Sequence, residues 1–299
     1  MTKRAKPHFY ILPALILMCL LSFVPNLYSV YLAFTNFSLF HYSDFEFVGL
    51  KNFYKILGSS EVKTFLRVTV WTLAWAFFSV IFAAIVGLFL AIPLNKEGLK
   101  GAKIYRTLFI VPWAIPAFIS VMMWRGLFNT SSGQINALLG ILHIEPIPWL
   151  DEPVWACISV LMVNVWLGYP FMMTICLSAL QSIPKSVYEA ADIDGASNWL
   201  QFQAITLPLL KASLLPVLIS NFAFNFNQFA AIYLLTEGRP AVAGSDAGAT
   251  DILITYSYKL AFNLYQYGIA CAYAIIIFLV VASISGINIK LTGAFDDDK

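Results

Sequence analysis

Long apolar runs alternate with shorter polar segments along the whole of this sequence. Six runs are long enough to cross a bilayer, because a hydrocarbon core of about 30 Å needs about 20 helical residues. They cover approximately residues 9–34, 68–94, 108–127, 154–180, 214–235 and 264–289. Backbone amides in lipid must be paired within their own segment, so such runs favour helices over barrel strands. The pattern predicts an all-α, polytopic membrane protein with six transmembrane helices and a polar loop between the fourth and the fifth.

Composition agrees with a membrane protein. Hydrophobic residues make up 60% of the sequence and charged residues 11%, which leaves too little polar surface to cover a water-soluble domain. The first run follows a basic start, but it is too long for a signal peptide and lacks a small-residue cleavage site, so we expect a retained helix. The cysteines all fall within predicted spans, which favours packing roles over disulfide bonds: Cys19, Cys157, Cys176 and Cys271.

The distribution of Lys and Arg predicts the orientation. With both termini inside the cell, eleven of the 18 Lys and Arg residues fall in the inner segments, in line with the excess of positive charge found on the cytoplasmic side of membrane proteins. The bias is strongest in the first two inner segments. It places the polar loop at 183–208 in the cytoplasm.

The predicted spans are almost free of ionisable residues, which are the usual devices of ion-coupled transport. Arg125 is the exception, and we expect its long side chain to snorkel to the interface. The sequence also contains no phosphate-binding loop of the form G-x4-G-K-[ST] and no catalytic or metal-ligating constellation. An ion-coupled secondary carrier is therefore a weaker alternative, an embedded enzyme is weaker still, and energy is expected from a separate subunit.

The polar loop at 183–208 has the pattern of two short helices joined by a turn. Ser186 and Glu189 have the spacing of a capping box that begins the first helix, and Gly195 can end it in the left-handed conformation. Ser197 or Asn198 can cap the second helix, which should stop before Pro208. An amphipathic hairpin lying on the inner leaflet would show the same periodicity.

Within this loop, the spacing E-A-A-x3-G-x9-I-x-L-P resembles the coupling-loop signature of the membrane subunits of bacterial ABC importers. The matching residues are Glu189, Ala190, Ala191, Gly195, Ile205, Leu207 and Pro208. The resemblance implies that the loop docks into a cleft on a cytoplasmic ATPase, that Glu189 pairs with a basic group there, and that Gly195 lets the loop pivot. It also implies that ATP and Mg are bound by the ATPase, with no cofactor in this chain.

Further segments are similar to the larger membrane subunit of maltose and maltodextrin importers: residues 47–53, 164–171, 221–229, 234–238 and 247–251. The likeness implies a single transmembrane domain over 1–299, with core helices at about 66–289 and the coupling loop at about 183–208. It implies a bacterial cell membrane location. The implied partners are a second homologous permease subunit, a cytoplasmic ATPase homodimer and an extracytoplasmic sugar-binding protein, with no nucleic acid. The outer loop 238–250 resembles the segment facing the binding protein, although a flexible connector would look the same.

Amides and aromatic rings in the fourth and fifth spans suggest where cargo binds. Asn221, Asn225 and Gln228 follow one another at i, i+4, i+7 with Phe224 beside them, and a second set repeats that relation in the fourth span. Uncharged amides with flat rings suit a neutral, hydroxyl-rich ligand, but amides also bond neighbouring membrane helices to each other. The resemblance implies sugar contacts at Leu167, Gly168, Phe171, Asn221, Phe224, Asn225 and Gln228, with Asn164 one turn away.

Together these observations predict a transmembrane permease subunit of an ATP-driven, binding-protein-dependent importer of neutral oligosaccharides. Maltose or maltodextrin is the first expectation for the cargo. Another sugar, a polyol or a glycerophosphate would fit the same importer class.

Overall fold

The computed structural model describes residues 8–58, 61–96 and 98–292, and these residues are nearly all helical. No β-strand forms among them; the extended pairings are isolated bridges such as Thr35 with Phe47. The all-α prediction is confirmed. The chain order is α1 (His8–Met18), a π-helix (Cys19–Phe23), α2 (Val24–Ala33), α3 (Lys51–Gly58), α4 (Val62–Leu94), α5 (Ala102–Ala114), α6 (Ala117–Leu127), α7 (Gln134–Ile141), α8 (Pro153–Gln181), α9 (Lys185–Ile193), α10 (Asn198–Gln201), a second π-helix (Phe202–Thr206), α11 (Leu207–Phe226), α12 (Phe229–Thr236), α13 (Leu253–Phe262) and α14 (Tyr267–Thr292).

Five helices in the described residues are long and apolar enough to span a membrane: Tyr10–Ala33, Val62–Leu94, Pro153–Gln181, Asn198–Phe226 and Tyr267–Lys290. The predicted third span is instead a bent pair, in which α5 and α6 meet at 88°. Ile115 is extended at the bend because the ring of Pro116 disfavours the α conformation in the preceding residue. The six predicted spans are therefore five continuous helical spans and one broken one.

The fifth span differs from its predicted bounds at both ends. The helix ends at Phe226, and α12 begins only after Asn227 and Gln228. It also starts well before the predicted residue 214, because the chain runs through Pro208 without a break. The expected stop before Pro208 is wrong: the π-helix directly before it widens the turn, with the Leu207 N–H bonded to the Phe202 carbonyl, and a proline in the first turn of α11 gives up no needed donor.

The chain divides into two compact units. The first comprises the described residues of Met1–Leu66 together with Tyr256–Leu279. In it, the Asn52 side chain donates to the carbonyls of Ala33 at 2.9 Å and Thr35 at 2.7 Å. These bonds join α3 to the end of α2.

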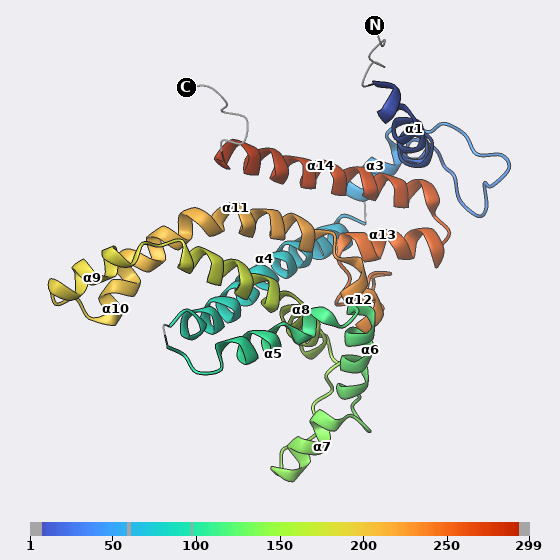
Figure 1. The fold of residues 1–299 in the computed structure, drawn as a ribbon. Coiled ribbons are helices and arrows are strands. Elements are labelled where there is room, and N and C mark those ends of the chain that lie inside the picture. The colour runs from blue at the N-terminus through green and yellow to red at the C-terminus, as the bar shows by residue number, and fades with distance from the viewer. Residues whose placement is uncertain (1–7, 59–60, 97, 293–299) are drawn as a thin grey trace, which may run out of the picture. The chain divides into compact units, whose positions relative to one another are not determined.

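The second unit comprises Arg67–Thr255 and the described part of Val280–Lys299, and it contains every candidate site residue. One apolar core of this unit joins α4, α8 and α11 through Ala91, Met173, Cys176, Leu180 and Leu210. Figure 1 shows α9 and α10 at one end of α8 and α11, and α12 beside α6 at the other. Cys176 thus packs as predicted, whereas Cys19 of the first unit is exposed.

Candidate functional site

The predicted helix–glycine–helix loop forms, and Gly195 ends its first helix. Gly195 has φ +75°, the left-handed conformation that a glycine adopts at low cost. The Ala196 N–H donates to the Ala191 carbonyl at 2.9 Å, and the Gly195 N–H donates to the Asp192 carbonyl at 3.0 Å. This pair of bonds is the Schellman arrangement, which satisfies the last carbonyls of a helix.

The structure confirms the predicted cap of the loop's second helix but not that of its first. Ser197 caps α10, since its hydroxyl accepts the Leu200 N–H at 3.3 Å, as predicted. The capping box at Ser186 and Glu189 is wrong: α9 begins at Lys185 with Pro184 as its N-cap and no side-chain capping bond. Pro184 already sets the extended entry into the helix, so Ser186 lies two residues past the capping position.

The loop presents most of the resemblance residues to solvent. Glu189, Ala190, Gly195, Leu207 and Pro208 are exposed, and Ala191 and Ile205 are half-buried. Large apolar side chains are exposed beside them, namely Val187, Ile193, Trp199 and Leu200. Ile193 is 87% exposed and was missed by sequence reasoning, although its place between two aspartates at a helix end is a signal for exposure.

Two pairs of side chains inside the loop bond its two halves together. The Gln201 amide donates to the Asp192 carboxylate at 2.6 Å and to the Ala196 carbonyl at 3.0 Å. The hydroxyls of Tyr188 and Thr206 lie 2.9 Å apart and share a hydrogen bond. No sequence motif pointed to these residues, because the pairs join positions nine and eighteen residues apart.

In the transmembrane part, the structure brings three of the predicted amides together. Asn164 of α8 donates to the Asn225 side-chain oxygen of α11 at 2.6 Å, and Asn225 donates to the Asn221 carbonyl and side-chain oxygens at 2.9 and 3.1 Å. The Trp75 indole of α4 donates to the Asn225 carbonyl at 3.0 Å. Asn164 and Asn225 are each only 7% exposed, so these amides do bond neighbouring helices.

The other predicted contacts divide into exposed and packed residues. Phe224 is 65% exposed, whereas Phe171 packs on the cluster of Val80, Ala83 and Met172. Leu167 and Gly168 are half-buried. A methyl group added to Gly168 would meet Ala83 at an ordinary 3.5 Å, so this glycine lies on the α4 side of α8.

Gln228 does not continue the predicted polar stripe. It follows the end of α11 and serves as the N-cap of α12, with φ −79° and ψ 85°. The i, i+4, i+7 relation therefore holds for Asn221 and Asn225 but fails at Gln228, because the helix on which it depends stops at Phe226.

A cavity of about 550 Å³ lies among α4, α5, α6 and α8 and contains none of the predicted contact residues. Its lining is apolar and aromatic: Phe82, Val86, Leu90, Phe109, Trp124, Ile158, Leu161, Met162, Val165, Trp166 and Tyr169. Such a lining offers few partners for hydroxyl groups.

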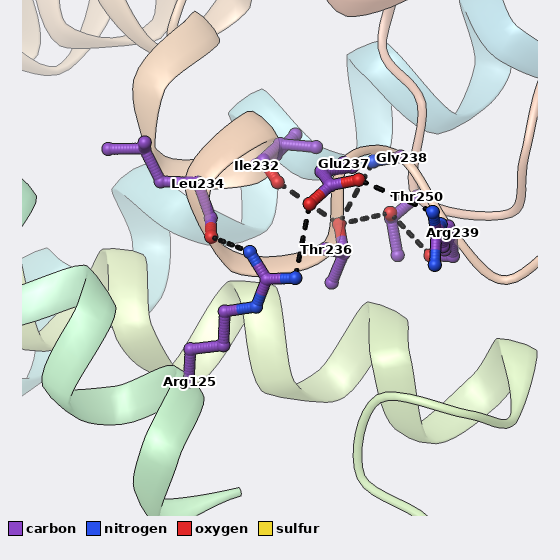
Figure 2. A network of polar contacts seen from close by, with 8 residues as sticks. All are labelled: Arg125, Ile232, Leu234, Thr236, Glu237, Gly238, Arg239 and Thr250. Atoms are coloured by element: carbon purple, nitrogen blue, oxygen red, sulfur yellow. Dashed lines mark hydrogen bonds and ion pairs between the residues drawn. The ribbon is translucent and has the colours of Figure 1, made fainter. Parts of the chain in front are cut away.

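Arg125 joins α6 to the end of α12, as Figure 2 shows. Its guanidinium donates to the Leu234 carbonyl at 3.2 Å and to the Glu237 carboxylate at 3.1 Å. The side chain pairs with a carboxylate and caps a helix C-terminus, where a cation is favoured, and its snorkelling to the interface stays a prediction. Beyond it, Thr250 donates to the Arg239 carbonyl at 2.8 Å and shares a 2.7 Å bond with Thr236.

Comparisons with known proteins show the family of this chain. Residues 83–289 match the family described as "Binding-protein-dependent transport system inner membrane component". The galactooligosaccharides transport system permease protein GanP of Bacillus subtilis (strain 168) is 37% identical over 96% of this chain and 70% of its own length. The maltodextrin transport system permease protein MdxF of the same strain is 37% identical over 98% of this chain and 70% of its own length.

A third relative and one solved structure extend the comparison. The maltose/maltodextrin transport system permease protein MalF of Photorhabdus laumondii subsp. laumondii is 43% identical over 82% of this chain, which spans about half (48%) of that relative. A chain from a bacterial ABC transporter involved in the import of the acidic polysaccharide alginate superimposes with a TM-score of 0.78 at 23% identity, covering 97% of this chain and 96% of that one. This last likeness concerns the fold alone.

Proposed function

This chain belongs to the family of binding-protein-dependent transport system inner membrane components, and we propose that it is the permease subunit of an ATP-driven importer of neutral oligosaccharides, with maltodextrins as its first cargo. It is a multi-pass membrane protein of the ABC permease class. The observation that carries the choice of a neutral cargo is the uncharged amide chain of Asn164, Asn225 and Asn221.

The chemistry of these three hydrogen-bonded amides supports a hydroxyl-rich ligand. Amides donate and accept, so they bond hydroxyl groups in either direction, and the exposed ring of Phe224 lies on the same helix. Asn164 and Asn225 use their bonds on each other, so we assign them the role of holding Asn221 and Phe224 in place. Leu167, Gly168, Phe171 and Gln228 are the further proposed contacts; the first three require the sugar to pass beside α8.

The second part of the proposal concerns energy. The loop at 183–208, with Glu189, Ala190, Ala191, Gly195, Ile205, Leu207 and Pro208, docks on a cytoplasmic ATPase homodimer that binds ATP and Mg. Its exposed apolar side chains suit the desolvated centre of a protein interface. A second homologous permease subunit and an extracytoplasmic sugar-binding protein complete the importer, and both termini of this chain lie in the cytoplasm.

Galacto-oligosaccharides are the second candidate cargo. The relative named for them matches this chain at the same 37% identity as the relative named for maltodextrins. Both cargoes are neutral and rich in hydroxyl groups, so the amide chain does not separate them.

The test is ATP hydrolysis by the complete complex in proteoliposomes, with the binding protein and a panel of maltose, maltotriose, galacto-oligosaccharides and glycerol phosphates. We expect strong stimulation by one neutral saccharide, which would also identify the cargo. Stimulation only by a charged ligand would contradict the neutral-sugar assignment. Stimulation by none of the ligands would remove the support for a sugar importer.

A further inference from the structure

Gln201 is a buried polar residue in a loop that is otherwise mostly exposed. Gln201 is 8% exposed, and its side-chain amide donates to the Asp192 carboxylate in α9 and to the Ala196 carbonyl at the turn. Burying an amide is tolerated only where its hydrogen bonds are made. The side chain therefore holds α10 against the last turn of α9.

A second bond completes the same brace further from the turn. Tyr188 and Asp192 are four residues apart in α9 and share a face. Gln201 is the residue directly before the π-helix Phe202–Thr206, and Thr206 is the last residue of that helix. The two are five residues apart, which is the hydrogen-bond repeat of a π-helix. The π-helix thus brings Thr206 into line with Gln201, so that the hydroxyl of Tyr188 reaches Thr206 while Asp192 reaches Gln201.

The braced half of the loop continues directly into the transmembrane region. Residues 198–226 form one unbroken helical span of 29 residues. That span begins at the braced loop, and its next-to-last residue is Asn225, whose side chain bonds Asn164. A movement applied to α9 can reach Asn225 through this span only if α9 and α10 move together.

We propose that Gln201, Tyr188 and Thr206 are positioning residues that make the coupling loop a rigid lever. Movement received from the ATPase on α9 then passes to α11 instead of being absorbed at the turn around Gly195. Rigid packed elements and hydrogen-bond networks are what carry such coupling between distant sites. The inference rests on the proposed importer function and adds the residues through which the loop transmits motion.

The test uses the complex purified through this chain and reconstituted with its binding protein. In the same vesicles, one measures the sugar accumulated and the ATP hydrolysed, and takes their ratio. We expect Gln201→Ala to lower the ratio about fivefold, within the range by which residues along a coupling route alter it, while hydrolysis continues. The matched control is Gln181→Ala, which removes the same side chain from an exposed position at the end of α8, outside the loop at 183–208, and should leave the ratio unchanged.

Exchanging the amide of Gln201 and the carboxylate of Asp192 separates transmission of movement from simple packing. Gln201→Glu sets a second carboxylate against Asp192 and should lower the ratio as Gln201→Ala does. Adding Asp192→Asn restores a donor on the α9 side and should recover most of the ratio, which loss of packing alone would not predict. The inference is overturned if Gln201→Ala keeps the wild-type ratio or if the double variant is no better than Gln201→Glu. A wild-type complex without saccharide-dependent hydrolysis would instead overturn the proposed function, and the inference with it.

Discussion

Asn164 of α8 donates a 2.6 Å hydrogen bond to the side-chain oxygen of Asn225 on α11, sixty-one positions later in the chain. Both side chains are buried, and the second passes the connection to Asn221 in its own helix. A buried amide that loses its partner costs about 1–3 kcal/mol. The pair therefore fixes the mutual position of two transmembrane helices at the place where we propose that cargo passes.

Replacing Asn225 with alanine tests that relationship. Asn225→Ala removes the bonds to Asn164 and Asn221 and should destabilise the protein by about 1–3 kcal/mol while abolishing sugar uptake. Thermal unfolding of the purified permease and uptake in vesicles are the two measurements. Unimpaired uptake in this variant would mean that the amides only join helices.

Phe224 and Phe226 form a matched pair for separating cargo contact from packing. Phe224 is 65% exposed and Phe226 fully buried, at 0%, although both lie in the last turn of α11. Phe224→Ala should lower uptake without changing the unfolding temperature. Phe226→Ala should cost about 3–5 kcal/mol of stability, as truncation of a buried phenylalanine does. Normal uptake with Phe224→Ala would remove this ring from the proposed site.

Sequence periodicity was informative where one helix alone sets the geometry. The apolar runs, the turn at Gly195 and the Ser197 cap depend on residues close in the chain, and all three appear in the structure. The misses have another origin. The bend at Ile115, the π-helix before Pro208 and the helix end at Phe226 each interrupt an apparently regular run, and a proline or polar residue inside an apolar run does not reveal whether the helix bends, widens or stops.

The polar contacts between elements were the least predictable part of the molecule. The prediction for Arg125 used only its apolar neighbours in the sequence, because its partner Glu237 lies 112 residues away. Gln201 carries no motif, and its burial follows from the folding of α10 onto α9. Contacts of this kind depend on tertiary packing, which local patterns do not encode.

Two glycines that face neighbouring helices should respond differently to replacement by alanine. A methyl group on Gly87 would lie 2.6 Å from the Met173 backbone nitrogen and 2.7 Å from the Met172 carbonyl carbon, so α4 and α8 would have to separate. Gly87→Ala should cost about 1–3 kcal/mol, as overpacking does. Gly168→Ala adds its methyl at 3.5 Å from Ala83 and should leave the unfolding temperature nearly unchanged. A large loss of stability in the Gly168 variant would contradict the close fit described for α4 and α8.

The ion pair of Arg125 and Glu237 should contribute modestly to stability. The two side chains are 40% and 38% exposed, so water screens the pair, and exposed pairs contribute about 0–1 kcal/mol. The bond to the Leu234 carbonyl adds the capping of α12, and Arg125→Ala should therefore cost about 1 kcal/mol. Exchanging the charges, with Arg125→Glu and Glu237→Arg together, should restore the pair without the cap. A double variant that unfolds at a lower temperature than both single variants would show that the pairing is not what holds α6 to α12.

Gly195 allows strain and clearance to be distinguished at the proposed coupling loop. Its φ of +75° makes any side chain costly by about 1–2 kcal/mol, yet an added methyl would meet nothing within 4 Å. Within this chain, a larger residue should therefore destabilise the fold hardly more than alanine does. Asparagine tolerates the left-handed conformation better than alanine does, so strain alone predicts more transport from Gly195→Asn than from Gly195→Ala.

If α9 and α10 sit in a cleft of the ATPase, clearance decides instead: transport should fall from alanine to asparagine and vanish with Gly195→Trp, while the protein remains in the membrane. Uptake assays on membranes with matched amounts of each variant decide between the two orders, and normal uptake by Gly195→Trp would mean that this turn does not contact the ATPase.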